Sequence, residues 1–207
     1  YIDFSSQWAV TNLGHGHPEV VEAVKGQVER LVFSSHTSFP NVPAIELAEE
    51  LVKITPGEFR KKVWFGLSGS DANEFIYKVM PVYSGRRRFL SFHGSYHGQT
   101  MGALSLSGHK ALTRLIGFAN VVKAPYPYCY RCPFKRSYSE CGLFCLEFLE
   151  EQVMEQAPAD DLAAVVVEPI QSDGGVIVPP SEFLPRLAEL CREKGISLVV
   201  DEVKVGF

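Results

Sequence analysis

The chain has 207 residues, of which 46% are hydrophobic and 21% are charged, and its formal net charge is -4. This balance is typical of a globular protein with one large domain, and the positive residues form no broad basic face of the kind that binds nucleic acids. No apolar run approaches the roughly 20 residues of a membrane span, so the composition predicts a soluble, cytoplasmic protein without a membrane partner.

Two amphipathic helices are predicted in the first quarter of the chain. One has Pro18 in its first turn and apolar residues at helical spacing as far as Val32, and the other runs from about Val42 to a Thr-Pro-Gly stop signal at 55–57. Residues 1–4 (YIDF) alternate like the middle of a strand, and the chain ends just beyond another apolar run. We therefore expect the sequence to be an internal piece of a longer polypeptide.

From residue 63 onward, apolar strands alternate with helices. A capping box of Asp71 and Glu74 is predicted to start the first of these helices, and Pro81 to disturb its end. The strands are uniformly apolar, which predicts an α/β fold with a mixed, mainly parallel sheet covered by helices on both faces. We expect strands at 63–67, 89–92, 163–168 and 196–201, and helices at 71–83 and 183–194.

Two of the predicted strands lead into segments that could hold a phosphorylated ring. Gly69 and Ser70 lie in a turn from a strand into a helix, where backbone N–H groups and the helix dipole favour an anion. Tyr96 follows the next strand together with His93 and His97, and an aromatic side chain there could stack on a flat heterocycle. Taken singly, a Ser at a helix start is most often a cap, and the two histidines would more often be structural loop residues than catalytic ones.

Two further strands end in carboxylates. Glu168 follows one of them and is succeeded by Asp173 near a pair of glycines, and Asp201 follows the last strand. A carboxylate in a poorly solvated site can keep a cationic ring nitrogen protonated, because opposite charges favour the ionised pair. Open α/β sheets bind ligands at the carboxyl ends of their strands, so we expect these segments to converge on one ligand.

Together, the segments 67–74 (LSGSDANE), 95–98 (SYHG), 167–171 (VEPIQ) and 200–203 (VDEV) resemble the class III aminotransferases, which are pyridoxal-phosphate enzymes of fold type I. Residues 12–18 (NLGHGHP) also match the opening of that family, so the resemblance covers essentially the whole chain. It is strongest to archaeal-type 4-aminobutyrate or ornithine aminotransferases and to the amino-acid racemases related to them.

The resemblance implies a role for each strand-end residue. Gly69 and Ser70 would hold the phosphate of pyridoxal 5'-phosphate, and Tyr96 would stack on its ring. Asp201 would pair with the ring nitrogen, and Val203 would pack against the opposite ring face. The remaining implied members of the cofactor and substrate site are His97, Glu168, Asp173 and Lys204.

The same resemblance implies that residues 1–40 contribute to a small domain and a linker helix, and that 41–207 form an incomplete large domain. Lys204 stands near the ring's 3' oxygen, where the family usually carries Gln, and it is not the Schiff-base lysine. That lysine lies a few tens of residues beyond the Asp-Glu strand in the family, so we expect the isolated 207-residue chain to be inactive.

The implied reaction transfers an amino group from an amino acid, such as 4-aminobutyrate or ornithine, to a 2-oxo acid in a homodimer or a dimer of dimers. Amino-acid racemisation is the alternative, because both reactions begin with removal of the same Cα proton. A strand that ends in Asp-Glu also resembles the magnesium-binding strand of P-loop ATPases, but the chain contains no G-x-x-x-x-G-K-[ST] loop.

Four cysteines, Cys129, Cys132, Cys141 and Cys145, have the spacing C-x2-C-x8-C-x3-C. This spacing is compatible with a zinc site, with disulfides or with free thiols. A structural zinc-binding module built on these cysteines is therefore a distant alternative function.

Overall fold

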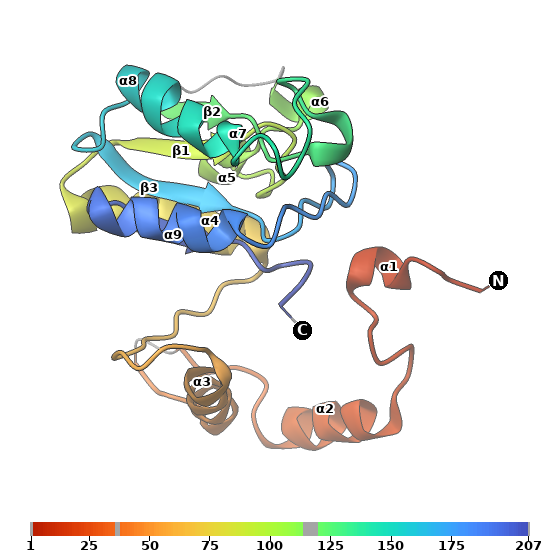
Figure 1. Ribbon diagram of the computed structural model, residues 1–207. Helices are drawn as coiled ribbons and strands as arrows, with labels where there is room; N and C mark the ends of the chain where they lie inside the picture. The colour runs from red at the N-terminus through yellow and green to blue at the C-terminus, as the bar shows by residue number, and fades with distance from the viewer. Residues whose placement is uncertain (1, 36–37, 114–119, 207) are drawn as a thin grey trace. The chain divides into compact units, whose positions relative to one another are not determined.

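The computed structural model describes residues 2–35, 38–113 and 120–206. The chain divides into two compact units, Tyr1–Phe65 and Gly66–Phe207. The first unit contains helices α1 (Ser6–Ala9), α2 (Pro18–Arg30) and α3 (Val42–Ile54), which are labelled in Figure 1. The division into a small-domain segment at 1–40 and a large domain at 41–207 concerns the whole protein and stays a prediction.

The two longer helices of the first unit lie where the sequence predicted them, each with a proline in its first turn. Asn41 caps α3, because its side-chain oxygen accepts a hydrogen bond from the N–H of Ala44 at 3.0 Å. None of the described residues of this unit is buried, and large apolar side chains such as Trp8 and Val28 are more than half exposed. The unit therefore has no hydrophobic core among its described residues.

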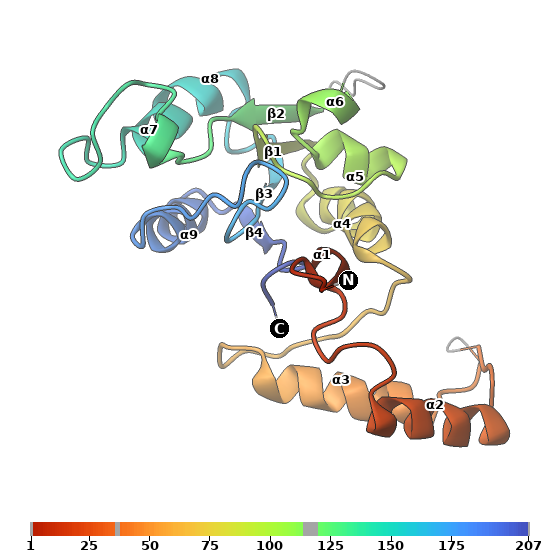
Figure 2. The same ribbon diagram turned by 90° about the vertical axis from the view of Figure 1, so that its right-hand side faces the viewer.

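A parallel sheet forms the centre of the second unit (Figures 1 and 2). In the described part of the chain it has four strands, in the order β2 (Val121–Ala124), β1 (Arg88–Phe92), β3 (Leu162–Val167) and β4 (Ser197–Val200). Val165 of β3 pairs with Leu90 on one side and with Leu198 on the other. Because these strands are parallel, their carboxyl ends share one edge of the sheet, which positions the functional site.

Helices cover both faces of this sheet, so all six residues of β3 are buried. One face is covered by α4 (Gly69–Ser84) and α5 (Met101–Leu106), and the other by α7 (Phe144–Phe148), a π-helical turn (Leu149–Val153), α8 (Met154–Gln156) and α9 (Phe183–Glu193), as Figure 2 shows. Phe89 and Val166 point to the α4 face, whereas Leu90 and Val165 point to the α9 face. This arrangement confirms the predicted α/β fold of fold type I.

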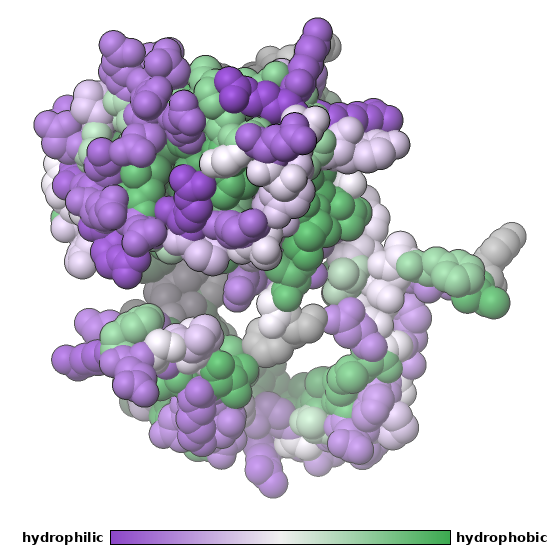
Figure 3. All heavy atoms as spheres, viewed as in Figure 1, coloured by the Kyte–Doolittle hydropathy of each residue, from purple (hydrophilic) through white to green (hydrophobic). Residues whose placement is uncertain are grey.

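The remaining short elements are α6 (Lys110–Thr113) and a 3-10 turn (Cys129–Arg131). Helix α9 buries an apolar stripe that includes Phe183 and Leu187. Hydrophilic residues cover much of the face of the second unit that Figure 3 shows. None of the helices in the described part of the chain combines the length and the apolar character that crossing a membrane requires.

The strand predicted at 63–67 is absent, and these residues have irregular backbone structure instead. A strand is stabilised by backbone hydrogen bonds to a neighbouring strand, and the four-stranded sheet of the described residues does not include this segment. Apolar alternation alone therefore overestimated strand structure at this position. The sequence reading also missed β2, which has only four residues and includes Lys123.

The predicted capping box of α4 is wrong. Ser68 is the N-cap, and its hydroxyl accepts a hydrogen bond from the N–H of Asp71 at 3.2 Å. Glu74 instead accepts a hydrogen bond from the N–H of Gly102 at 2.7 Å, at the start of α5. Pro81 lies inside α4, which continues to Ser84 and ends at Gly85 in the left-handed conformation.

Candidate functional site

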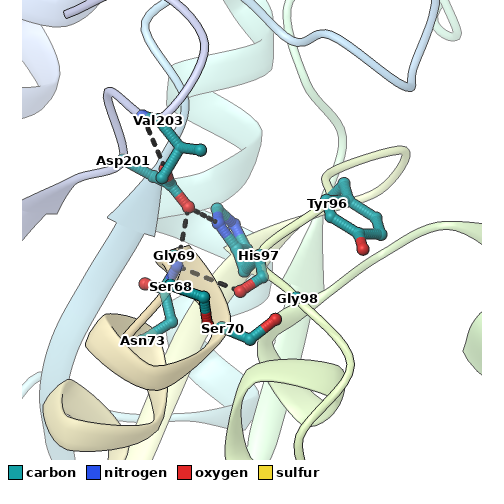
Figure 4. A pocket seen from close by; sticks show the side chains of 9 residues that line it. All are labelled: Ser68, Gly69, Ser70, Asn73, Tyr96, His97, Gly98, Asp201 and Val203. Carbon is teal, nitrogen blue, oxygen red and sulfur yellow. Dashed lines mark hydrogen bonds and ion pairs between the residues drawn. The ribbon is translucent and has the colours of Figure 1, made fainter. Parts of the chain in front are cut away.

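A cavity of about 150 Å³ lies at the carboxyl edge of the sheet (Figure 4). Its walls come from the N-terminus of α4, the turn after β1 and the segment after β4. Three of the strand-end segments selected from the sequence therefore meet in space. The lining residues are Ser68, Gly69, Ser70, Asn73, Tyr96, His97, Gly98, Asp201 and Val203.

The N-terminus of α4 forms one wall of the cavity. The first N–H groups of a helix have no acceptor within the helix, and the helix dipole is positive there, so this wall can bind an anion. Two glycines allow the close packing around it. A Cβ atom on Gly69 would lie 2.8 Å from Cγ2 of Val203, and one on Gly98 would lie 2.7 Å from Cα of Ser70.

Asp201 lies at the base of the cavity, and its backbone N–H donates to the carbonyl of Val167 at 2.8 Å. Its Oδ2 atom lies 2.8 Å from Nδ1 of His97 and accepts a hydrogen bond from Nδ2 of Asn73 at 2.8 Å. Burial opposes ionisation of this carboxyl group, but the contacts with His97, Asn73 and the N–H of Val203 outweigh it, and the pKa of Asp201 is lowered. The carboxylate is therefore held ionised and oriented.

His97 links this carboxylate to the turn after β1. Its N–H donates to Oγ of Ser107 at 2.9 Å, and its carbonyl accepts from Nδ2 of Asn73 at 3.0 Å. The residue is only 2% exposed, and among the described residues its Nε2 atom has no hydrogen-bond partner. Figure 4 shows His97, Asn73 and Asp201 joined as one cluster, with Tyr96 apart from it.

Tyr96 is held by its backbone and by its hydroxyl group. Its N–H donates to Oε2 of Glu168 at 3.1 Å, and its hydroxyl accepts from Nε2 of Gln99 at 3.0 Å. Glu168 also accepts from the N–H of Ser172 at 3.2 Å. Burial raises the pKa of Glu168, although the nearby His97 and the two N–H donors act in the opposite direction.

A second, smaller cavity of about 40 Å³ shares Tyr96, Asp201 and Val203 with the first. Glu168, Asp173 and Lys204 line it, so a cationic and two acidic side chains surround the space beside Tyr96. The nine residues that the sequence predicted for the site are thus divided between two adjoining cavities.

His93 lines neither of these two cavities. The sequence analysis missed the positions of Asn73, Gln99 and Ser107 in this network. Asn73 could have been found only as a polar residue in the first turns of the helix that follows the Gly69-Ser70 turn.

The four clustered cysteines line a separate small cavity of about 20 Å³. No disulfide joins them in the structure, and among the described residues no group of three or more His, Cys, Asp or Glu side chains is arranged to hold a metal ion. Burial raises the pKa of Cys145 to about 11, with a further contribution from Cys129. The zinc, disulfide and free-thiol alternatives stay predictions.

Comparison with known proteins identifies the family. The family model for class III aminotransferases matches residues 1–207. The chain belongs to the class III aminotransferases. It is 42% identical to a leucine/methionine racemase of Thermococcus litoralis, covering all of this chain and 47% of the racemase. It is also 35% identical to a probable 4-aminobutyrate aminotransferase of Bacillus subtilis, covering all of this chain and 48% of that protein.

The solved structures of this family agree with the fold. An amine transaminase from an uncultivated Pseudomonas species, in its PLP-bound form, matches 99% of this class III chain with a TM-score of 0.92 and 33% identity. The match covers 48% of that structure, and the chain spans about half the length of the curated relatives it matches. The family and these PLP-bound neighbours indicate pyridoxal 5'-phosphate as the cofactor.

Proposed function

We propose that this chain forms the cofactor-binding part of an enzyme that transfers an amino group from an amino acid to a 2-oxo acid. The observation that carries this proposal is the ionised carboxylate of Asp201, which His97 and Asn73 hold at the base of a cavity that begins at a helix N-terminus. An anion site and a buried carboxylate in one cavity match a ligand with a phosphate at one end and a basic ring nitrogen at the other.

The lining residues fit pyridoxal 5'-phosphate. The N-terminus of α4 and Ser70 would hold its phosphate, Tyr96 and Val203 would contact the two faces of its ring, and Asp201 would keep its ring nitrogen protonated. When bound, the cofactor supplies an electron sink for the charge left on the substrate after a Cα bond breaks. The task of Asp201 is to keep one proton at the ring nitrogen, and its lowered pKa suits that task.

The donor, the assembly and the compartment are parts of the same proposal. The Bacillus subtilis relative favours 4-aminobutyrate or a similar amino acid as donor, and the family favours a homodimer or a dimer of dimers in the cytoplasm. We place the lysine that binds the cofactor covalently outside these 207 residues. On this proposal the isolated chain would bind the cofactor without sustained turnover.

Racemisation is the second candidate, and two observations favour it. The relative with 42% identity is a racemase. In addition, Lys204 and Asp173 line the cavity beside Tyr96, and racemisation requires groups that can remove a proton from Cα and return it on the other face. An amine and a carboxylate in one cavity could contribute to such an exchange.

One experiment separates the two candidates in the full-length enzyme. The enzyme with bound pyridoxal 5'-phosphate is incubated with a single L-amino acid, with and without a 2-oxo acid, and both products are resolved by chiral chromatography. Transamination forms a new amino acid only when the 2-oxo acid is present, whereas racemisation forms the D-enantiomer without it. The Asp201→Asn variant should lower either activity by about 100-fold. Full activity in this variant would refute the proposed role of Asp201.

A further inference from the structure

Lys123 is a cation in the interior of the second unit that the proposed chemistry does not use. It lies on the edge strand β2, and its ammonium group meets three oxygens. Its Nζ atom donates to Oγ of Ser91 at 2.6 Å, to the carbonyl of Ser105 at 2.8 Å and to the carbonyl of Leu106 at 2.6 Å. Three acceptors match the three N–H donors of a protonated lysine.

Two of these acceptors are the last carbonyls of α5. The last four carbonyls of a helix have no donor within the helix, and a cation near them is favourable. The partners of Lys123 among the described residues are all neutral oxygens, so its charge is directed at the end of α5 rather than at a carboxylate. The ammonium group therefore caps the end of α5, together with the hydroxyl of Ser91, which donates to the carbonyl of Leu106 at 2.7 Å.

The end of α5 is in turn bound to the turn that carries the site residues. Ser107, the next residue, accepts a hydrogen bond from the N–H of His97 at 2.9 Å, and its hydroxyl donates to the carbonyl of Gly98 at 3.1 Å. The N–H of Gly108 donates to the carbonyl of Ser95 at 2.8 Å. Residues on both sides of Tyr96 thus take their position from the segment that Lys123 anchors.

We propose that Lys123 is a positioning residue for the cofactor site, acting through the end of α5 and Ser107 to hold Tyr96 and His97 in place. This inference rests on the proposed function, because it assigns a purpose to the position of those two side chains. Lys123 itself lines neither site cavity, so it does not contact the cofactor.

If Lys123 acts through its charge, cofactor binding should depend on pH in a way that it would not if the side chain only filled space. Burial lowers the pKa of Lys123 to about 7, and the titratable groups coupled to it are His93, whose pKa burial also lowers, and through His93 the exposed Lys110. A neutral amine has two N–H donors for three acceptors. The anchor therefore weakens as the pH rises through about 7.

The test compares the full-length wild-type enzyme with Lys123→Met, and with Lys110→Met as the matched control for loss of a positive charge near His93. The dissociation constant of pyridoxal 5'-phosphate is measured by absorbance titration from pH 6 to pH 9. Lys123→Met should weaken binding by about tenfold at pH 6, because displacement of Tyr96 and His97 loses contacts. The ratio to wild type should shrink as the pH rises, and Lys110→Met should follow the wild type throughout.

Ser107→Ala keeps the test decisive if Lys123→Met does not fold, because it breaks the same connection without removing a charge. It should also weaken cofactor binding and should retain the pH dependence of the wild type. Wild-type affinity in both variants, or a ratio for Lys123→Met that does not change with pH, would overturn this inference alone. A wild-type enzyme that does not bind pyridoxal 5'-phosphate would overturn the proposed function as well.

Discussion

The Nδ1 atom of His97 lies 2.8 Å from Oδ2 of Asp201, although 104 residues separate the two in the sequence. Both side chains are almost fully buried, with 0% and 5% of the side-chain surface exposed. The contact lowers the pKa of Asp201 against the effect of burial, so His97 favours the ionised form of that carboxyl group.

Replacing His97 with Leu should therefore raise the pKa of Asp201, because burial then lacks its main opposing contribution. Because the pKa of Asp201 is lowered, its ionised form is retained to lower pH than in an ordinary aspartate. In His97→Leu the acid limb of the pH–activity profile should move to higher pH, and activity at neutral pH should fall by about tenfold. The profile of kcat against pH in the full-length enzyme measures both effects.

His93→Leu is the matched control for this variant. His93 belongs to the same turn as His97, but it lines neither site cavity. Its acid limb should coincide with that of the wild type. An unshifted acid limb in His97→Leu would show that His97 does not set the ionisation of Asp201.

Gly98→Ala should disturb the anion-binding wall of the cavity. Gly98 has a φ of +119°, and a Cβ atom there would lie 2.7 Å from Cα of Ser70, so both the backbone and the α4 terminus must shift. We expect a loss of about 1–3 kcal/mol in unfolding free energy and weaker cofactor binding. Denaturant unfolding and absorbance titration measure the two effects.

Gly142→Ala provides the comparison, because Gly142 also has a positive φ of +58° but no atom within 4 Å of the added Cβ. It should lose stability through backbone strain alone and keep the wild-type affinity for pyridoxal 5'-phosphate. Equal cofactor affinity in the two variants would contradict the packing of Gly98 against Ser70.

Glu74→Ala should destabilise the second unit by about 1–2 kcal/mol, because two N–H groups at the start of α5 lose their acceptor. Burial raises the pKa of Glu74, but hydrogen bonds from Thr100, Gly102 and Ala103 outweigh it and the pKa is lowered. The stabilisation is therefore complete above pH 4.5 and disappears as the pH falls through the lowered value. Urea unfolding at several pH values measures this difference.

The exposed Glu155 of α8 gives the control substitution, Glu155→Ala, which should leave stability within about 0.5 kcal/mol of wild type. A pH-independent difference between Glu74→Ala and wild type would mean that the ionised carboxylate is not what stabilises α5.

The thiols should be unreactive and metal-free. Burial raises the pKa of Cys145 to about 11 and that of Cys191 to about 12, so at pH 8 both are mostly protonated and slow to react. Alkylation followed by mass spectrometry should label these two cysteines in the denatured protein and only slowly in the native one. Elemental analysis that found stoichiometric zinc would instead support a metal site in the cysteine cavity.

The sequence was most informative where a local pattern determines local structure. The apolar run of β3 and the spacing of α9 predicted those elements, and small residues at the start of α4 predicted the cavity wall. The motifs also located Asp201 and Tyr96, because parallel strands bring their carboxyl ends to one edge. Local chemistry and topology were sufficient there.

Partners distant in the sequence could not be predicted in the same way. Asn73 donates to Asp201 across 128 residues, and that contact depends on sheet register and helix rotation, which no short motif records. Glu74 was predicted to cap the start of α4, the helix to which it belongs. In the structure it instead accepts hydrogen bonds from N–H groups at the start of α5. The strand β2 was missed because four residues at a sheet edge, one of them Lys123, carry too little periodicity.

The hydrogen bond from the N–H of Asp201 to the carbonyl of Val167 continues the β3–β4 pairing one residue beyond the strand. The main chain thus fixes the backbone position of Asp201, while the side chains of His97 and Asn73 orient its carboxylate. Residues such as Asp173 and Lys204 can change during evolution without displacing it. The relatives of this chain include both a racemase and an aminotransferase, and a carboxylate whose position depends on strand pairing can be retained while residues around it differ.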